Sequence, residues 1–167
     1  VDTALDQVSE GPGLTMASTN NLGMPGNGNS YRPFLSADGS QVAFESYSNN
    51  FSPADPVGAV DIYVKNLISG EISLASSNSQ GVVASGTSQN VSISSDNRYA
   101  LFESNASNLV AGDTNSTWDI FIKDLLTGTI TRASTDSSGL QANGGSYKAR
   151  LSDDGCYLVF QSDATNL

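Results

Sequence analysis

The chain of 167 residues contains no histidine and only one cysteine, and both shortages exclude classes of function. Without histidine there is no Ser-His-Asp or Cys-His catalysis, and the commonest zinc ligand is missing. The single cysteine, Cys156, cannot form an intrachain disulfide. Its position at the start of an expected strand indicates a tolerated, partly exposed thiol rather than a nucleophile.

Basic residues are also scarce, since the chain has 7 of them and 17 acidic residues, which gives a net charge of −10. Such a surface repels phosphate backbones, so nucleic-acid binding is not expected. The same charge either favours a cation or only keeps the protein soluble. Charged residues make up 14% of the chain, against roughly 25% in an average soluble domain, and Ser, Thr, Asn and Gly supply the remaining polarity.

Long apolar runs are absent as well, because none approaches the roughly 20 residues of a membrane helix. No membrane span is therefore expected. The chain begins at Val1 rather than Met, which indicates a processed or excised piece with no signal peptide remaining. No segment keeps an apolar period of 3.6 residues, so no helix longer than one turn is expected.

What the sequence does contain is an internal repeat with an offset of 58 residues. Residues 119–125 (DIFIKDL) align with residues 61–67 (DIYVKNL). The same offset aligns three turns, at residues 36–39 (SADG), 94–97 (SSDN) and 152–155 (SDDG). An Asp-Gly pair between apolar runs is a strong hairpin signal, in which both central residues take positive φ.

Short strands are expected around each of these turns. They comprise a first strand at 33–35, 91–93 and 149–151, a second at 41–46, 99–104 and 157–162, a third at 61–67 and 119–125, and a fourth at 14–18, 71–76 and 129–134. Val42, Ala43 and Phe44 are consecutive apolar residues, which indicates a strand covered on both faces. Arg132 and Glu71 on the fourth strand indicate an exposed outer edge.

Four antiparallel strands in a repeated unit are typical of the blades of an all-β β-propeller. A β-sandwich would not need an exact repeat of this length. We expect a single domain, 1–167, with about three blades: residues 1–18 complete a blade, 31–76 and 89–134 are blades, and 147–167 form the first half of a blade.

Three blades are too few to close a ring, because propellers have about 4–8. One interpretation is a two-fold homodimer with six blades, in which residues 1–9, as a degenerate third strand, help to complete the partner's last blade. The other is a fragment of a longer propeller.

Asp113, Asn115 and Asp119 are the candidate metal ligands. They lie at the first, third and seventh positions of one acidic loop, and carboxylate and amide oxygens are the ligands that Ca²⁺ prefers. Alternatively, Asp113 and Asn115 form side-chain turns and Asp119 caps the entry to the strand. The equivalent loop from Asp55 to Asp61 has Val57 at its centre, which weakens the same prediction there.

Two further features invite a functional interpretation. Glu45 and Glu103 occupy the same repeat position, which would allow carboxylate-pair chemistry on glycosides, but Gln161 stands in the third unit. Trp118, the only tryptophan, is either a stacking platform for a ligand or a ring packed over its loop. No nucleophile constellation accompanies them, so no catalytic residue is assigned and no enzyme activity is expected.

Residues 94–128 carry a resemblance to a known family. The TolB-type, WD-repeat-like β-propeller repeat of bacteria, in its long-repeat secreted branch, is similar to this segment at Phe102, Ser104, 106–110 (ASNLV), 112–115 (GDTN), 119–121 (DIF), Asp124-Leu125 and Thr127-Gly128. The first unit departs from this pattern at residues 48–51 and 56–57, and the third follows it to Leu167. The family includes translocation accessories, peptidase-associated domains and repeats of surface proteins.

The repeat, the acidic loop and the absence of histidine together favour a non-enzymatic module, and the resemblance implies a place outside the bacterial cytoplasm, either secreted, at the cell surface or in the periplasm. It would act as a binding or structural scaffold for a protein or glycan ligand. The blade count favours self-association, and the acidic loop makes calcium the only candidate cofactor. Two alternatives stay open. One is a carbohydrate-active enzyme or carbohydrate-binding propeller that uses Glu45 and Glu103, and the other is a periplasmic TolB-like protein-interaction propeller.

Overall fold

The structure is a computed structural model that describes residues 7–10, 13–55, 58–152 and 155–167. Within these ranges it consists of strands and loops, and no helix is long and apolar enough to cross a membrane. The strands are β1 (Gln7–Glu10), β2 (Gly13–Met16), β3 (Ser30–Leu35), β4 (Gln41–Ser46), β5 (Asp61–Asn66), β6 (Ile72–Leu74), β7 (Ser88–Ile93), β8 (Tyr99–Ser104), β9 (Asp119–Asp124), β10 (Ile130–Arg132), β11 (Ser146–Leu151) and β12 (Leu158–Ser162).

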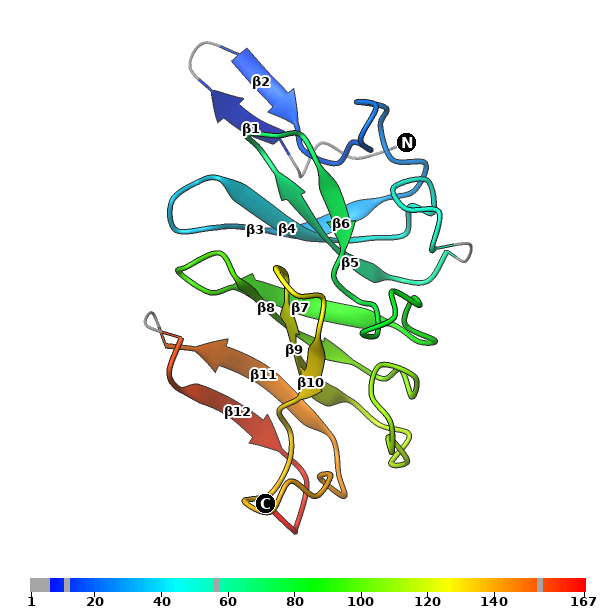
Figure 1. Ribbon diagram of the computed structural model, residues 1–167, viewed down its shortest axis with the longest axis vertical. Coiled ribbons are helices and arrows are strands. Elements are labelled where there is room, and N and C mark those ends of the chain that lie inside the picture. Colours follow the sequence, from blue (N-terminus) through cyan, green and yellow to red (C-terminus); the bar gives the residue numbers. More distant parts are fainter. Residues whose placement is uncertain (1–6, 11–12, 56–57, 153–154) are drawn as a thin grey trace.

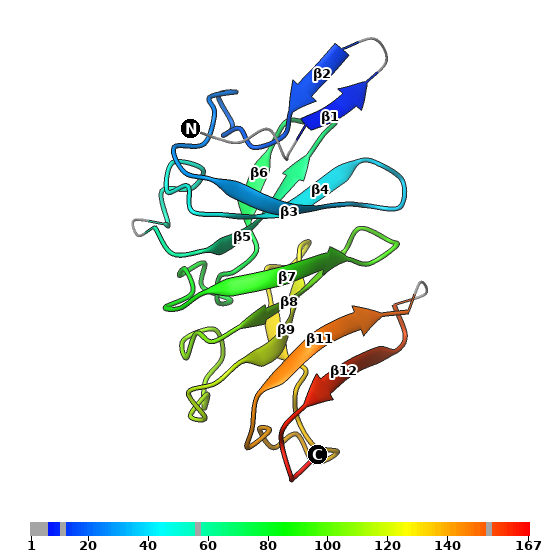
Figure 2. The same ribbon diagram turned by 180° about the vertical axis from the view of Figure 1, so that it is seen from behind.

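Antiparallel pairing joins the strands into four sheets. Two sheets have four strands, in the orders β3-β4-β5-β6 and β7-β8-β9-β10, and two have a single pair, β1-β2 and β11-β12. The sheets follow one another along the long axis of the molecule, with the two pairs at opposite ends (Figure 1). From behind, β3, β7 and β11 lie in succession along one side (Figure 2). The expected all-β architecture of repeated four-stranded blades is confirmed.

The two complete blades share the same pairing register. Gln41 pairs with Asn66 between β4 and β5, and Tyr99 pairs with Asp124 at the equivalent place between β8 and β9. The first strand of each blade also carries a bulge at the same place, where the register shifts. The repeat in the sequence is therefore a repeat in backbone geometry.

The hairpins after the first strands differ from the expected two-residue turn. Only the last residue of each turn, Gly39, Asn97 and Gly155, has positive φ among the described residues, at 73°, 61° and 69°. The chain closes a longer loop instead, in which the N–H of Gly39 donates to the carbonyl of Ser36 at 2.9 Å. A single left-handed residue closes such loops, and both glycine and asparagine tolerate that conformation.

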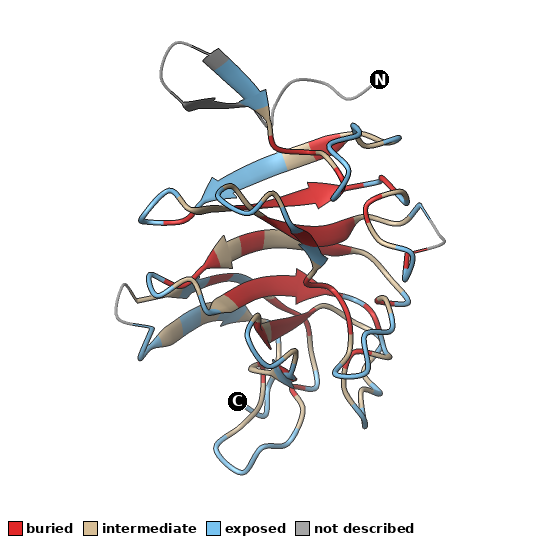
Figure 3. Ribbon diagram, turned by 45° about the horizontal axis from the view of Figure 1, so that its top comes forward, coloured by how far each residue is buried: buried red, intermediate tan, exposed pale blue. Residues whose placement is uncertain are grey.

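The core lies within and between the blades, and burial is concentrated in their central strands (Figure 3). Val42, Ala43 and Phe44 are all buried, which confirms that β4 is covered on both faces. Phe44 stacks on Tyr63 with ring centroids 6.1 Å apart, and Phe102 stacks on Phe121 at 6.0 Å. Each blade therefore holds an equivalent aromatic pair.

The amino-terminal segment packs against the first complete blade as the fourth strand of a preceding blade would. Lys65 Nζ donates to the carbonyls of Thr19 and Asn20 at 3.0 and 3.3 Å. Lys123 Nζ donates to the equivalent carbonyls of Ser77 and Asn78 at 2.8 and 3.1 Å. The same contact thus joins both pairs of neighbouring blades.

The expected third strand within residues 1–9 is found as β1, in part. Residues 1–6 lie outside the described ranges, and β1 pairs with β2 through Gln7 and Met16. In the complete blade the residue equivalent to Met16 is Leu74, which pairs with Tyr63. The pairing of β1 is therefore displaced by two residues, and a displacement of two keeps the same face of the strand.

Candidate functional site

The repeated glutamates lie at the contacts between blades. Glu45 in β4 and Glu103 in β8 are both buried. Glu45 Oε1 accepts the backbone N–H of Asn90 at 2.7 Å, and Glu103 Oε1 accepts that of Lys148 at 2.6 Å. Each of these bonds joins one blade to the next.

The bulge in the following blade makes this bond possible. Asn90 and Lys148 occupy the bulges of β7 and β11, with φ of 57° and 53°. A bulge leaves one residue out of the regular ladder, so its N–H can be directed to another sheet. A charged acceptor of a backbone N–H gives a stronger hydrogen bond than a neutral one. The bulge and the glutamate therefore form one structural unit.

The remaining glutamate oxygens are also engaged. Arg32 Nη1 lies 3.3 and 3.4 Å from the two oxygens of Glu45, and Asn90 Nδ2 donates to Glu103 Oε2 at 2.9 Å. Asn90 thus contacts both carboxylates, through its backbone and its side chain. The structure places the two glutamates at successive blade contacts, where each completes the hydrogen bonding of a neighbouring strand.

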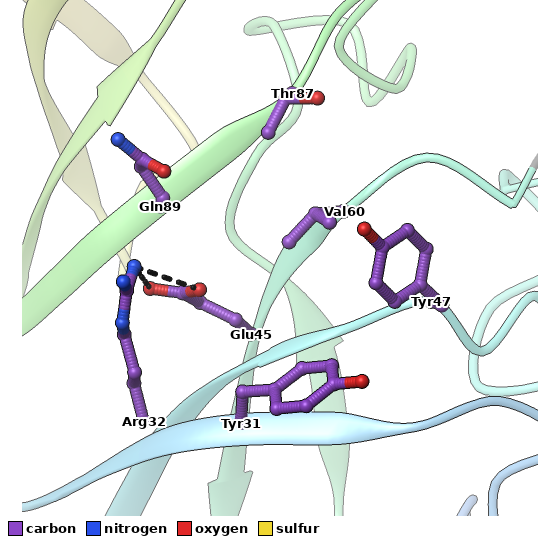
Figure 4. A pocket seen from close by; sticks show the side chains of 7 residues that line it. All are labelled: Tyr31, Arg32, Glu45, Tyr47, Val60, Thr87 and Gln89. Atoms are coloured by element: carbon purple, nitrogen blue, oxygen red, sulfur yellow. Dashed lines mark hydrogen bonds and ion pairs between the residues drawn. The ribbon is translucent and has the colours of Figure 1, made fainter.

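An open cleft of about 440 Å³ lies above the first of these contacts. Tyr31, Arg32, Glu45, Tyr47, Val60, Thr87 and Gln89 line it. Figure 4 shows the tyrosine rings on the β3–β4 side and, opposite them, Gln89 on β7 and Thr87 directly before that strand. The rings of Tyr31 and Tyr47 meet edge to face with centroids 6.1 Å apart, and Tyr47 is exposed.

The chemistry of this cleft is aromatic and hydrogen-bonding, with little free charge. The Arg32 guanidinium neutralises Glu45, while Gln89 and Thr87 offer neutral amide and hydroxyl groups. Aromatic faces with a few polar groups around them are typical of sites for polar organic ligands. The arrangement supports binding, and Glu45 is held by its partners rather than presented as an acid or base.

Sequence reasoning missed the two tyrosines of the cleft. Tyr31 is replaced by Gln89 in the second unit but recurs as Tyr147 in the third, whereas Tyr47 is replaced by Asn105 and Asp163. A departure from a repeat marks a residue that the architecture itself does not require. The aromatic ring of Tyr47 at a non-repeating position was the available signal.

The structure brings the three candidate metal ligands together. Asn115 Nδ2 donates to Asp119 Oδ2 at 2.9 Å, and Gln141 Nε2 donates to Asp113 Oδ1 at 2.9 Å. Ser134 Oγ donates to Asp119 Oδ1 at 2.6 Å. Their neighbours therefore direct N–H and O–H groups at the carboxylate oxygens.

Arg132 is part of the same cluster. Its Nη1 lies 3.6 Å from Asp113 Oδ1, and its side chain is only 10% exposed, so the expectation of an exposed outer edge is wrong at Arg132, whereas Glu71 is exposed. Burial and then the charge of Asp119 raise the pKa of Asp113, while Arg132 and Gln141 oppose this rise. Hydrogen bonds from neighbouring side chains and the ion pair with Arg132 hold the two carboxylates of the cluster in place.

The orientation of the amides decides how this cluster would receive a cation. Asn115 Nδ2 also donates to the carbonyl of Ala142 at 3.0 Å, and Gln141 Oε1 accepts the N–H of Thr114 at 3.1 Å. These bonds fix which end of each amide faces the carboxylates. Within the described residues no group of three or more acidic or cysteine ligands surrounds a metal position. The residues as they lie do not fit a cation, and calcium binding stays a prediction that requires rearrangement.

The equivalent loop of the first blade uses different partners. Asp55 Oδ2 accepts the hydroxyl of Tyr63 at 2.6 Å, and Asp61 Oδ1 accepts that of Ser76 at 2.6 Å. Asp61 Oδ2 is buried with no hydrogen-bond partner among the described residues. Val57, the centre of this loop, lies outside the described ranges. Trp118 is half-buried beside the second loop, and its carbonyl accepts the N–H of Ser146 at 2.8 Å.

Solved structures share this arrangement of blades. A putative TolB from Agrobacterium tumefaciens aligns with 83% of this chain and 40% of its own, at 20% identity and a TM-score of 0.54. The fold is that of a TolB-type β-propeller. The β-propeller domain of the Trilobed protease from Pyrococcus furiosus aligns with 80% of this chain and 34% of its own, at 16% identity and a TM-score of 0.49.

The chain thus spans less than half the length of each of these two solved chains. No protein-family model matches the chain, and no curated protein matches it. The resemblance seen in residues 94–128 is confirmed at the level of the fold.

Proposed function

We propose that this TolB-type propeller is a non-enzymatic binding module whose ligand occupies the cleft between Tyr47 and Gln89. The observation that carries the proposal is that the residues that join the blades differ from the residues that line the cleft. Glu45 and Glu103 recur and hold neighbouring blades, whereas Tyr47 does not recur and lines an open cleft beside Tyr31. The repeat supplies the scaffold and the departures from it supply the binding surface.

The chemistry of the cleft favours an uncharged polar ligand. The exposed ring of Tyr47 can stack on the apolar face of a sugar, and Gln89 and Thr87 can exchange hydrogen bonds with its hydroxyl groups. A short glycan is therefore the ligand class we propose first. A peptide would use the same ring and the same neutral groups, and it is the alternative outcome of the test.

Calorimetric titration with panels of neutral oligosaccharides and peptides tests this proposal. We expect one class to bind and Tyr47→Ala to weaken binding at least about tenfold, because the ring forms much of the wall. Tyr99→Ala, which removes a ring outside the cleft, should leave binding unchanged. Binding that survives Tyr47→Ala would contradict the proposed site.

The competing enzyme is tested with the same reagents. Turnover of a polysaccharide that vanishes in Glu103→Gln would favour catalysis by the repeated glutamates. We expect no turnover, because both carboxylates are held by N–H groups of neighbouring strands.

We further propose that the module acts outside the bacterial cytoplasm, at the cell surface, in the medium or in the periplasm, as the repeat resemblance implies. Cell fractionation with an antibody against the chain tests this location. Detection confined to the cytoplasmic fraction would contradict it.

A further inference from the structure

The first strands of the successive blades form one surface with a groove in it. β3, β7 and β11 lie in succession along one side of the molecule (Figure 2). Two neighbouring hollows, of about 250 and 240 Å³, lie on this side, and residues of all three strands line each of them. Both hollows share Phe34, Ser92 and Arg150, so one ligand can occupy the two together.

The three shared residues occupy the same position of the repeat. Ser92 follows Phe34 by the offset of the repeat, and Arg150 follows Ser92 by the same offset. An aromatic ring, a hydroxyl and a guanidinium therefore stand at equivalent places. On the same strands the neighbouring residues Val91 and Ala149 are both apolar and buried. The shared position varies because the blades themselves do not require any one of its side chains.

Arg150 brings an unpaired positive charge to both hollows. Three ion pairs join described residues, and none of them involves Arg150. Its one hydrogen bond to a described residue runs from Nη1 to the carbonyl of Ala149 at 2.9 Å. In a chain with a net charge of −10, an exposed guanidinium without a carboxylate partner favours an anionic ligand.

Arg32 brings a second set of unused donors to the larger hollow. All of its hydrogen bonds to described residues, with Glu45 and with Asn90 Oδ1, are made by Nη1. Its Nε and Nη2 keep their donors, and 60% of the side chain is exposed. This guanidinium can therefore hold Glu45 and bind a ligand at the same time.

Ser92 adds a hydroxyl that the fold leaves unsatisfied. Its Oγ is buried and has no hydrogen-bond partner among the described residues. A buried hydroxyl without a partner costs free energy, so its presence at the wall of both hollows calls for an acceptor. An oxygen atom of a bound anion would be that acceptor.

The balance of charge fits a ligand with a single negative charge. Arg32 and Arg150 supply two positive charges, and the carboxylate of Glu45 offsets one of them. A carboxylate matches the remaining charge. It also matches the geometry, because a planar guanidinium can donate two parallel hydrogen bonds to its two oxygens.

We propose that this groove binds a small organic acid, with its carboxylate at Arg32, Ser92 and Arg150 and its apolar body in the second hollow. Phe34, Leu35 and Leu151 line that hollow and supply apolar contacts. Each hollow is smaller than the roughly 300–1,000 Å³ of a drug-sized site, which limits the body to a short chain or one ring. The groove shares only Arg32 with the cleft proposed for a glycan.

Titration of the isotope-labelled chain with hexanoate, followed by nuclear magnetic resonance, tests the proposal. We expect saturable shifts at the amides of Ser92 and Arg150, and none with hexanamide, which has the same body without the charge. Arg150→Gln should weaken the binding of hexanoate about tenfold or more, because hydrogen bonds to a charged group are lost. Lys148→Gln is the matched control. It removes the same charge from β11, but Lys148 lines neither hollow, so at physiological salt the binding should stay nearly unchanged.

Ser92→Ala separates binding from folding. Because the hydroxyl has no partner among the described residues, the variant should melt no lower than the parent chain, yet bind hexanoate at least about threefold more weakly. Tyr47→Ala should leave the binding of hexanoate unchanged, so failure of this site and failure of the glycan cleft are told apart. Circular dichroism verifies the fold of each variant. The proposal is overturned by a lack of saturable hexanoate binding, by equal binding of hexanamide, or by equal losses in Arg150→Gln and Lys148→Gln.

Discussion

Glu103 and Lys148 join two blades through a single hydrogen bond of 2.6 Å, from the backbone N–H of Lys148 to Glu103 Oε1. The same bond joins Glu45 to Asn90 one repeat earlier. Both donors are residues of β-bulges. Each bulge therefore needs the buried carboxylate as an acceptor, and each carboxylate needs the bulge as a donor. Glutamate is a common catalytic residue, but the hydrogen bond between two sheets accounts for Glu103 at this position.

Replacement of Glu103 separates this structural role from any other. Glu103→Ala leaves the N–H of Lys148 without its acceptor and should cost about 1–3 kcal/mol of unfolding free energy. Glu103→Gln keeps an acceptor oxygen and should cost less. Denaturant unfolding measures both, with the exposed Glu71→Ala as control. Equal stability of Glu103→Ala and the parent chain would contradict the role.

Asp61 should make stability depend on pH. Burial raises the pKa of Asp61 to about 7, with the bond from Ser76 opposing the rise and the charge of Asp55 adding to it. In the unfolded chain the same carboxyl titrates near 3.8. Between these values only the folded state holds the proton, so the contribution of Asp61 to stability falls as pH rises from about 4 to about 7.

Asp61→Asn should remove this dependence. The variant should gain stability over the parent chain as pH rises through that window, by at most about 4 kcal/mol. Asp119→Asn is the matched control. Both oxygens of Asp119 accept hydrogen bonds, so this change should cost about 1–3 kcal/mol. Thermal melts across the pH range give both, and a difference for Asp61→Asn that is constant between pH 4 and 7 would refute the account.

The buried lysines test how the amino-terminal segment is attached. Burial lowers the pKa of both Lys65 and Lys123, and each donates to two backbone carbonyls in the segment that follows the last strand of the preceding blade. Lys123→Met should lower global stability by about 1–2 kcal/mol. Lys65→Met should instead raise amide exchange in residues 13–21, with a smaller global effect. If Lys65→Met left exchange there unchanged, β2 would be held by other contacts.

Melting with calcium and with a chelator tests the Asp113–Asp119 loop. The donors of Asn115, Gln141 and Ser134 occupy the carboxylates, and Arg132 lies beside Asp113 as an ion pair, so we expect equal midpoints in both conditions. A calcium-dependent rise that Asp113→Ala abolishes would show that the loop rearranges to bind metal, as the sequence predicts.

The repeat made most of the architecture predictable. The offset between Asp61 and Asp119 placed the strands, and the consecutive apolar residues 42–44 indicated burial on both faces, because these features depend on local pattern. The turn type was not predictable, because an Asp-Gly pair serves several loop lengths and only the φ of Gly39 decides between them.

The roles of the polar residues could not be read from the sequence. Glu45 and Asn90 meet across two sheets, and Arg132 reaches Asp113 from another strand, so no local pattern records either contact. The cleft likewise forms between two blades. Tyr47 could have been found only as an exception to the repeat, and Tyr31, which recurs as Tyr147, not even in that way.

Hydrogen exchange at the amide of Lys148 tests most directly whether one kind of contact joins the neighbouring blades of the chain. The account predicts that the amides of Asn90 and Lys148 are both protected, and that Glu103→Ala removes the protection of Lys148 alone. An amide of Lys148 that exchanges as an open one in the parent chain, or that stays protected in Glu103→Ala, would contradict it.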